Sequence, residues 1–365
     1  MKAFAMSVEI PSFPVPPAST SQTAGAESGY ERWQTTDADP QTTRPARRSL
    51  AMLAVRAGAF AIFLGVFLIF AVTAPYFLTI GNIGNVLGQS AITGVLAIGL
   101  TLVIIAGGSN VVTGGIDLSL AANMGLSAAV YAAIIQAGYG DAVAVAGALA
   151  TGLAIGAVNA AAVTLAGIVP LLATLAVMNV VAGLELVLTQ NTVIPAATDF
   201  LAALSASGPL GLPVLAYILV GFTLSVAVIV QATPLGLRLY AVGAFPEAAR
   251  AAGLPVKTFI GGSFLASGLS GGIAGILSVS YLSGSTTGAG DMLLPVVVTA
   301  LLGSVFSNRL IPTVTGTLLS ALFVGVLING FQLLNIPSTL VSGVQGLLIL
   351  LVVSATTLLG RKEAA

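Results

Sequence analysis

Residues 85–106 read NVLGQSAITGVLAIGLTLVIIA, a run without a single charged side chain. An α-helix needs about 20 apolar residues to cross the hydrocarbon core of a bilayer, so this run is long enough to span one. The same composition extends on both sides, because no Lys or Arg occurs between Arg56 and Arg238. The stretch therefore predicts a chain that crosses a membrane several times as helices.

The composition of the whole chain points the same way. Of its 365 residues, 57% are hydrophobic and 7% are charged, whereas a soluble domain carries about 25% charged residues. The net charge is zero, so no basic surface indicates a nucleic-acid partner. Cys and His are both absent, which excludes disulfides, thiol nucleophiles, Cys/His zinc sites and His bases. We expect the lipid bilayer as its surroundings, with no catalytic residue, no metal and no cofactor bound by this chain.

Apolar runs of spanning length recur along the chain and define the predicted domains. The ten candidate spans are 57–75, 85–106, 117–136, 142–165, 170–189, 213–231, 258–282, 291–307, 311–333 and 338–359. Residues 1–48 are rich in Pro, Ser, Thr and Ala and are predicted to form a disordered cytoplasmic tail before a transmembrane domain at 49–365. The predicted fold class is all-α, a polytopic membrane helix bundle with about ten transmembrane helices.

The basic residues test the number of spans, because cytoplasmic loops of membrane proteins carry an excess of Lys and Arg. If the N-terminal tail is cytoplasmic, six spans return the chain to the cytoplasm at 232–257, which contains three basic residues. Two more spans return it at Arg309, and two more leave Arg361 and Lys362 inside. Both termini and the 232–257 loop are thus predicted to be cytoplasmic.

A short helix is predicted inside this loop, beginning at Pro246. Proline suits the first position of a helix, Glu247 favours the positive end of the helix dipole, and Gly253 can end the helix. A helix of two turns is too short to be stable alone in water, so we expect it to dock on another surface. A plain connecting loop is the alternative interpretation.

A second segment, TGGIDLSL at 113–120, places a carboxylate at or near membrane depth. Gly114 and Gly115 are expected to interrupt a helix. A buried carboxylate such as that of Asp117 must be paired, capped or neutralised. We expect Asp117 to cap the following helix or to belong to a gate, and direct contact with a substrate is the alternative.

Glycines four residues apart occur inside several predicted spans. Such spacing lets helix backbones approach closely in lipid, so these pairs predict a tightly packed bundle. The pairs are Gly152 with Gly156, Gly268 with Gly272, and Gly271 with Gly275.

The loop and the TGGIDLS segment together resemble the monosaccharide (ribose, xylose and arabinose) permeases of bacterial ATP-binding-cassette importers. In that family the loop contacts the ATPase subunit. The matching loop positions are Gly243, Pro246, Glu247, Ala248, Ala249, Arg250 and Gly253. The resemblance covers about residues 50–360. It departs at Ala244-Phe245, where the family has Gly-Asn, and at 291–304, where Pro295 enters and the family's aspartate is missing.

The resemblance implies a transport subunit in the inner (plasma) membrane of a bacterium, forming the translocation path for a monosaccharide. It implies a separate ABC ATPase that binds ATP and docks on the 238–257 loop, because this chain has no phosphate-binding GxxxxGK[ST] loop and is not expected to be an enzyme. It also implies a second copy of the chain or a homologous permease, and a periplasmic or lipid-anchored sugar-binding protein. The candidate gating or path residues are Gly114, Gly115, Asp117, Ser119, Asn159, Thr174 and Asn329.

Other functions stay open at this point. A permease of the same fold for nucleosides or another small polar solute fits the same residues. An ion-coupled secondary transporter would need ionisable groups inside the membrane, and only Asp117 and Glu185 qualify. Glu185 is expected at the surface near the outer face, with contact to a substrate or binding protein as the alternative. An embedded enzyme would need clustered carboxylates, which the sequence lacks.

Overall fold

The computed structural model describes residues 45–108, 114–307, 311–348 and 350, with side chains from residue 56 onward. These residues form helices joined by loops and contain no β-strand. The contacts define a compact unit at Ser49–Ala365. The predicted tail at 1–48 lies almost wholly outside the described residues, and the first helix begins at Pro45, inside its predicted end.

The helices fall into long and short groups. The long ones are α1 (Pro45–Thr73), α2 (Ile80–Gly107), α3 (Leu120–Gln136), α4 (Asp141–Thr164), α5 (Pro170–Thr189), α7 (Val214–Ala232), α10 (Val256–Leu282) and α12 (Val314–Leu333). The short ones are α6 (Asp199–Ser205), η1 (Pro209–Gly211), α8 (Pro234–Ala244), α9 (Pro246–Ala251), η2 (Ala289–Met292) and α11 (Leu293–Leu302). A further helix covers Ser338–Leu348.

Each of the predicted spans overlaps at least one of these helices, and residues 349 and 351–359 of the last span lie outside the described part of the chain. Among the described residues, seven helices are long and apolar enough to cross a membrane. Three further apolar helices are shorter, at Leu120–Gln136, Ala289–Leu302 and Ser338–Leu348. The multi-pass helical class is therefore confirmed, while the number of about ten crossings and the cytoplasmic termini stay predictions.

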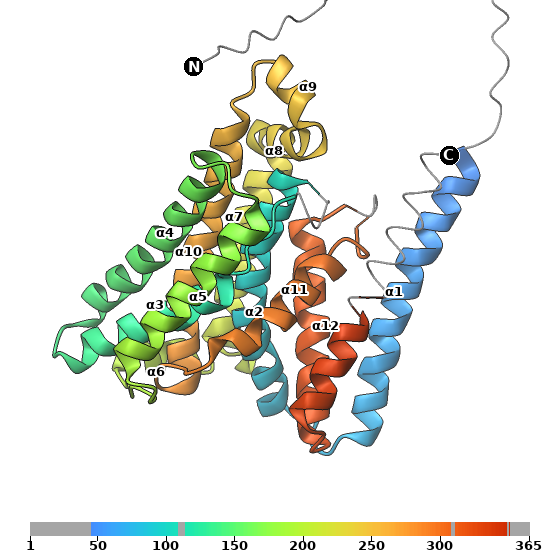
Figure 1. Ribbon diagram of the computed structural model, residues 1–365. Coiled ribbons are helices and arrows are strands. Elements are labelled where there is room, and N and C mark those ends of the chain that lie inside the picture. The colour runs from blue at the N-terminus through green and yellow to red at the C-terminus, as the bar shows by residue number, and fades with distance from the viewer. Residues whose placement is uncertain (1–44, 109–113, 308–310, 349, 351–365) are drawn as a thin grey trace, which may run out of the picture. The chain divides into compact units, whose positions relative to one another are not determined.

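α2 lies at the centre of the bundle (Figure 1) and packs against α7, α8, α10, α11 and α12. In the most apolar 18-residue stretch of α2, 94% of the residues are buried, compared with 6% in the corresponding stretch of α1. A helix that is apolar on all sides is expected in the interior of a bundle, so the uncharged run at 85–106 becomes the axis around which the others pack.

α4 and α10 approach each other backbone to backbone through two of the predicted glycine pairs, Gly152 with Gly156 and Gly268 with Gly272, while Gly271 and Gly275 face α3. A Cβ atom on Gly152 would lie 2.5 Å from the carbonyl oxygen of Gly268. A Cβ on Gly268 would lie 2.7 Å from the Cα of Gly156. No side chain larger than hydrogen fits at these positions, so the predicted role of the glycines in helix packing is confirmed.

Basic residues gather at one end of the bundle. α8, α9 and the start of α10 lie together at the upper end in Figure 1 and contain Arg238, Arg250 and Lys257. α6, which begins at Asp199, lies at the opposite end, where Thr198 donates a hydrogen bond of 2.7 Å to Asp141. This separation is the one that a cytoplasmic 232–257 loop would produce.

Candidate functional site

The short helix predicted at Pro246 is present as α9. Pro246 occupies its first turn, and the helix ends at Ala251. Gly253 follows with a φ of +82°, a conformation that glycine adopts without a steric penalty. There the N–H groups of Gly253 and Leu254 bond the carbonyl oxygens of Arg250 and Ala249, each at 3.0 Å. The predicted start and stop of the helix are thus confirmed.

α9 presents one face inward and the rest outward. Ala249 is buried in a small apolar cluster with Val242 and Val256. Glu247 and Arg250 are exposed and form an ion pair of 2.8 Å between Oε2 and Nη1. An exposed pair of this kind contributes roughly 0–1 kcal/mol, so it does little to hold the helix in place. Pro246 and Ala248, exposed beside this pair, complete the outward face.

α8 rests directly on the last turn of α2 through Gly243. A Cβ on Gly243 would lie 1.9 Å from the carbonyl oxygen of Ile105. A Cβ on Gly108 would lie 2.6 Å from the carbonyl oxygen of Gly243. The Tyr240 hydroxyl adds a hydrogen bond of 2.8 Å to the carbonyl oxygen of Pro312. The backbone of α8 is therefore fixed against α2, with no side chain between them.

The TGGIDLS segment packs on the same turn of α2. A Cβ on Gly115 would lie 2.1 Å from the carbonyl oxygen of Val103, and one on Gly107 would lie 2.1 Å from the Gly115 nitrogen. Gly114 and Gly115 also line a cavity of about 300 Å³. Residues 109–113 lie outside the described part of the chain. The end of α2 is thus held between Gly243 and Gly115.

Asp117 accepts four hydrogen bonds from neutral donors in the interior. Its Oδ1 accepts from the N–H of Ser119 at 3.0 Å, the hydroxyl of Ser119 at 2.6 Å and the amide of Asn159 at 3.3 Å. Its Oδ2 accepts from the hydroxyl of Ser267 at 2.8 Å. All four side chains are at most 1% exposed. Asp117 thus joins the entry of α3 to α4 and α10, and the predicted cap consists of a single bond to a backbone N–H.

Two other candidates differ in their relation to this cluster. Thr174, at the start of α5, donates to the carbonyl oxygen of Ile116 at 3.3 Å and lies beside the cluster. Asn329 lies elsewhere, because its amide exchanges two hydrogen bonds of 2.9 and 3.0 Å with Asn82. Six of the seven candidate residues are therefore brought together around 114–119, while Asn329 links α12 to α2.

The structure adds residues that the sequence did not single out for the site. Ser267 stands out in the sequence only as part of a glycine-rich span. Asn123 on α3 donates to the carbonyl oxygens of Gly152 and Gly268, at 3.4 and 3.2 Å. The residues next to Ser267 and Asn123 in the sequence do not indicate these roles, because the hydrogen-bond partners lie on helices distant in sequence.

The expected surface position of Glu185 is wrong. Its side chain is 2% exposed, and its Oε1 has no hydrogen-bond partner among the described residues. A Cβ on Gly125 would lie 2.7 Å from its Oε2, so the absence of a side chain at Gly125 leaves the room that the carboxylate occupies. α5 packs on α3, and this contact turns Glu185 inward.

A polar cavity of about 480 Å³ lies at the end of the bundle opposite α8 and α9. Its lining includes Asn85, Ser205, Ser207 and Tyr281. Amide and hydroxyl groups of this kind can donate and accept hydrogen bonds with a hydroxylated solute. The α2 glycines at 81, 84 and 88 keep one wall of the cavity free of side chains.

Comparison with known proteins places these features in a family. The family described as branched-chain amino acid transport system / permease component matches residues 82–353. The ribose import permease protein of Escherichia coli (strain K12) is 34% identical over 286 residues, which cover 77% of this chain and 87% of that protein. The ribose import permease protein of Bacillus subtilis (strain 168) is 34% identical over 309 residues, 83% of this chain and 92% of that protein. The L-arabinose ABC transporter permease protein of Azospirillum brasilense is 30% identical over 331 residues, 86% and 94% of the two chains. No solved structure matches.

Proposed function

Because this chain belongs to the family of branched-chain amino acid transport system permease components, we propose that it forms the translocation path for a monosaccharide in a bacterial inner membrane. The chain is a permease subunit of an ATP-binding-cassette sugar importer. Ribose and L-arabinose, which its relatives are named for, are both monosaccharides. A nucleoside or another small polar solute is the alternative cargo for the same path.

A separate ATPase binds to the 238–257 loop and drives transport through this path. The observation that supports this step is the position of the last turn of α2, between Gly243 on one side and Gly115 on the other. A displacement of α8 and α9 moves α2 because backbone atoms touch at Gly243. The same displacement reaches Gly115 and the segment that positions Asp117. Packed elements of this kind transmit a shift because close-packed interiors deform little.

The remaining partners bind at other parts of the bundle. A second copy of this chain, or a homologous permease, completes the path. A periplasmic or lipid-anchored sugar-binding protein delivers the sugar at the end that contains the polar cavity with Asn85 and Tyr281. ATP is bound by the ATPase, and this chain binds no cofactor.

The docking step is tested by reversing the charges on α9. Glu247→Lys should reduce co-purification of the ATPase while the permease still inserts into the membrane. Because Glu247 also pairs with Arg250, the double variant Glu247→Lys with Arg250→Glu is the matched control. It restores the ion pair and keeps the reversed pattern of charge. If the ATPase recognises this pattern, the double variant stays defective. Normal assembly and transport by Glu247→Lys would contradict the docking role.

The class of transporter is tested in sealed vesicles. The purified permease alone should take up no sugar, and uptake should appear when the ATPase, ATP and the binding protein are supplied. Uptake by the permease alone, driven by an ion gradient, would replace this proposal with a secondary transporter.

A further inference from the structure

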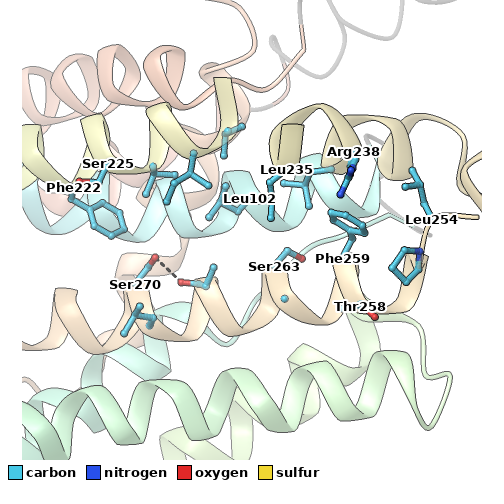
Figure 2. A pocket seen from close by; sticks show the side chains of 18 residues that line it. Leu102, Phe222, Ser225, Leu235, Arg238, Leu254, Thr258, Phe259, Ser263 and Ser270 are labelled. Carbon is cyan, nitrogen blue, oxygen red and sulfur yellow. Dashed lines mark hydrogen bonds between the residues drawn. The ribbon is translucent and has the colours of Figure 1, made fainter. Parts of the chain in front are cut away.

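A long apolar groove lies between α7, α8 and α10, over α2. Its volume is about 660 Å³, and 18 residues line it. Figure 2 shows Phe222 and Ser225 at one end, and Arg238, Leu254 and Thr258 at the other. The groove therefore extends from the end of the bundle that contains α8 and α9 into the predicted membrane interior.

The walls of this groove offer little to a polar solute. Three of its polar side chains are serines whose hydroxyls donate to carbonyl oxygens of their own helices. Ser225 bonds to Gly221 at 2.8 Å, Ser263 to Ile260 at 2.7 Å, and Ser270 to Ala266 at 2.9 Å. Most of the other lining residues are aliphatic or aromatic. The interior of the groove is thus suited to a hydrocarbon.

Arg238 is the charged residue among those that line the groove. Its side chain is exposed, and among the described residues no carboxylate pairs with its guanidinium. Glu247, the carboxylate on α9, is paired with Arg250. Arg238 therefore offers its hydrogen-bond donors to an anion at the predicted cytoplasmic surface of the membrane, where phosphate groups of lipids lie.

The length and the charge of the groove favour one kind of apolar occupant. Its lining on α10 runs from Thr258 to Ser270, which is about 18 Å at 1.5 Å per residue. A single extended hydrocarbon chain can lie along this apolar length. Because Arg238 lines the groove at the end near α8 and no carboxylate pairs with it among the described residues, a hydrocarbon chain that carries an anionic group matches the groove best.

We propose that this groove binds one acyl chain of an anionic phospholipid from the cytoplasmic leaflet, with the lipid phosphate bound to Arg238. The lipid lies against both α8 and α10, so it joins the ATPase-binding loop to the spanning helices. This inference rests on the proposed cytoplasmic orientation of the 232–257 loop. It needs no assumption about the cargo.

Two variants separate the headgroup from the acyl chain. Arg238→Gln removes the cation and leaves the groove open. Gly262→Leu fills the groove, because a Cβ on Gly262 has nothing within 4 Å and a leucine side chain can extend into this space. Lys257→Gln is the control for charge, since Lys257 is exposed at the same end and does not line the groove. Gly221→Leu is the control for bulk, because Gly221 also has open space around it and lies outside the groove.

The experiment measures lipid binding to the full chain by native mass spectrometry. The purified protein is titrated with phosphatidylglycerol and, separately, with phosphatidylcholine of identical acyl chains. The wild type should retain phosphatidylglycerol about fivefold more than phosphatidylcholine, the ratio that about 1 kcal/mol per basic residue near the membrane surface corresponds to. Arg238→Gln should abolish this preference by lowering phosphatidylglycerol retention more than phosphatidylcholine retention, because the choline cation already neutralises the phosphate of phosphatidylcholine. Gly262→Leu should reduce the retention of both lipids.

Three results would overturn the proposal. One is equal retention of the two lipids by the wild type. Another is a preference in Arg238→Gln that equals the preference in Lys257→Gln. The third is lipid retention in Gly262→Leu that equals the retention in Gly221→Leu. If Gly262→Leu then changes only the oligomeric mass, the groove binds a second copy of the chain and not a lipid. Sugar uptake is not measured in this assay, so its loss in another experiment would bear on the proposed function alone.

Discussion

Replacing Gly243 with alanine tests whether α8 drives α2 by direct backbone contact. The added Cβ would lie 1.9 Å from the carbonyl oxygen of Ile105. Carbon and oxygen atoms in close contact lie about 3.3 Å apart, so the two helices must separate by roughly 1.4 Å. The end of α2 cannot move toward Gly115 on its other side, because the two backbones already touch there: a Cβ added to Gly115 would lie 2.1 Å from the carbonyl oxygen of Val103. The displacement therefore falls on α8.

The size of the effect follows from the cost of overpacking. One extra methyl group in a close-packed contact costs about 1–3 kcal/mol. If this cost falls on the state in which α8 and α2 move together, sugar uptake per ATP hydrolysed should fall by about 5- to 150-fold. Gly261→Ala is the matched control, because its Cβ would lie at an ordinary 3.6 Å from the Cγ2 of Thr164.

The assay reconstitutes the permease, the ATPase and the binding protein in one vesicle preparation and measures sugar uptake and phosphate release together. Only complexes that co-elute with the ATPase are compared, so a folding defect is removed before the measurement. The Gly243→Ala complex should hydrolyse ATP with little uptake, and the Gly261→Ala complex should match the wild type. Wild-type uptake per ATP in an assembled Gly243→Ala complex would refute transmission through this contact.

Thermal unfolding of the purified permease tests three further positions. Asp117→Asn should lower the free energy of unfolding by about 1 kcal/mol or less, because the hydroxyl of Ser267 can rotate to accept a hydrogen bond from the new amide. Asp117→Ala leaves buried donors unpaired, at about 1–3 kcal/mol each. Equal effects of the two variants would mean that the charge itself is needed. Asn329→Leu should lower the unfolding midpoint, because the side-chain amide oxygen of Asn82 loses its donor. Changing both residues to leucine should cost less stability than the sum of the single changes. Additive losses would mean that the pair does not interact. Glu185→Gln should leave the unfolding midpoint unchanged or raise it, since the buried carboxylate has no cationic partner among the described residues. A clear loss of stability in this variant would contradict that account.

Features that depend on neighbouring residues could be predicted closely. α9 begins at Pro246 and is followed by the left-handed Gly253, because a proline at the start and a glycine after the end act within one or two turns. The apolar runs could be placed for the same reason, since the length of a span is a property of consecutive residues.

The partners inside the bundle could not be predicted in this way. The sequence indicates that Asp117 needs donors, but Ser267 lies 150 residues away and carries no mark of its role. Glu185 was misplaced because its burial depends on the missing side chain at Gly125, on another helix. Asn329 was grouped with Asp117 by resemblance, and the structure pairs it with Asn82 instead.

A multi-pass helical membrane protein with a short capped helix in a basic loop could be predicted from the amino-acid sequence. Hydropathy, charge and helix ends are all read along the chain. The packed helices were needed to show that the last turn of α2 lies between Gly243 and Gly115, and that Asp117 joins α3, α4 and α10. In lipid, a leucine gains little by facing protein rather than an acyl chain, so hydrophobicity does not select which helices meet. Close backbone contact and buried hydrogen bonds make that selection, and both appear only when the helices are packed.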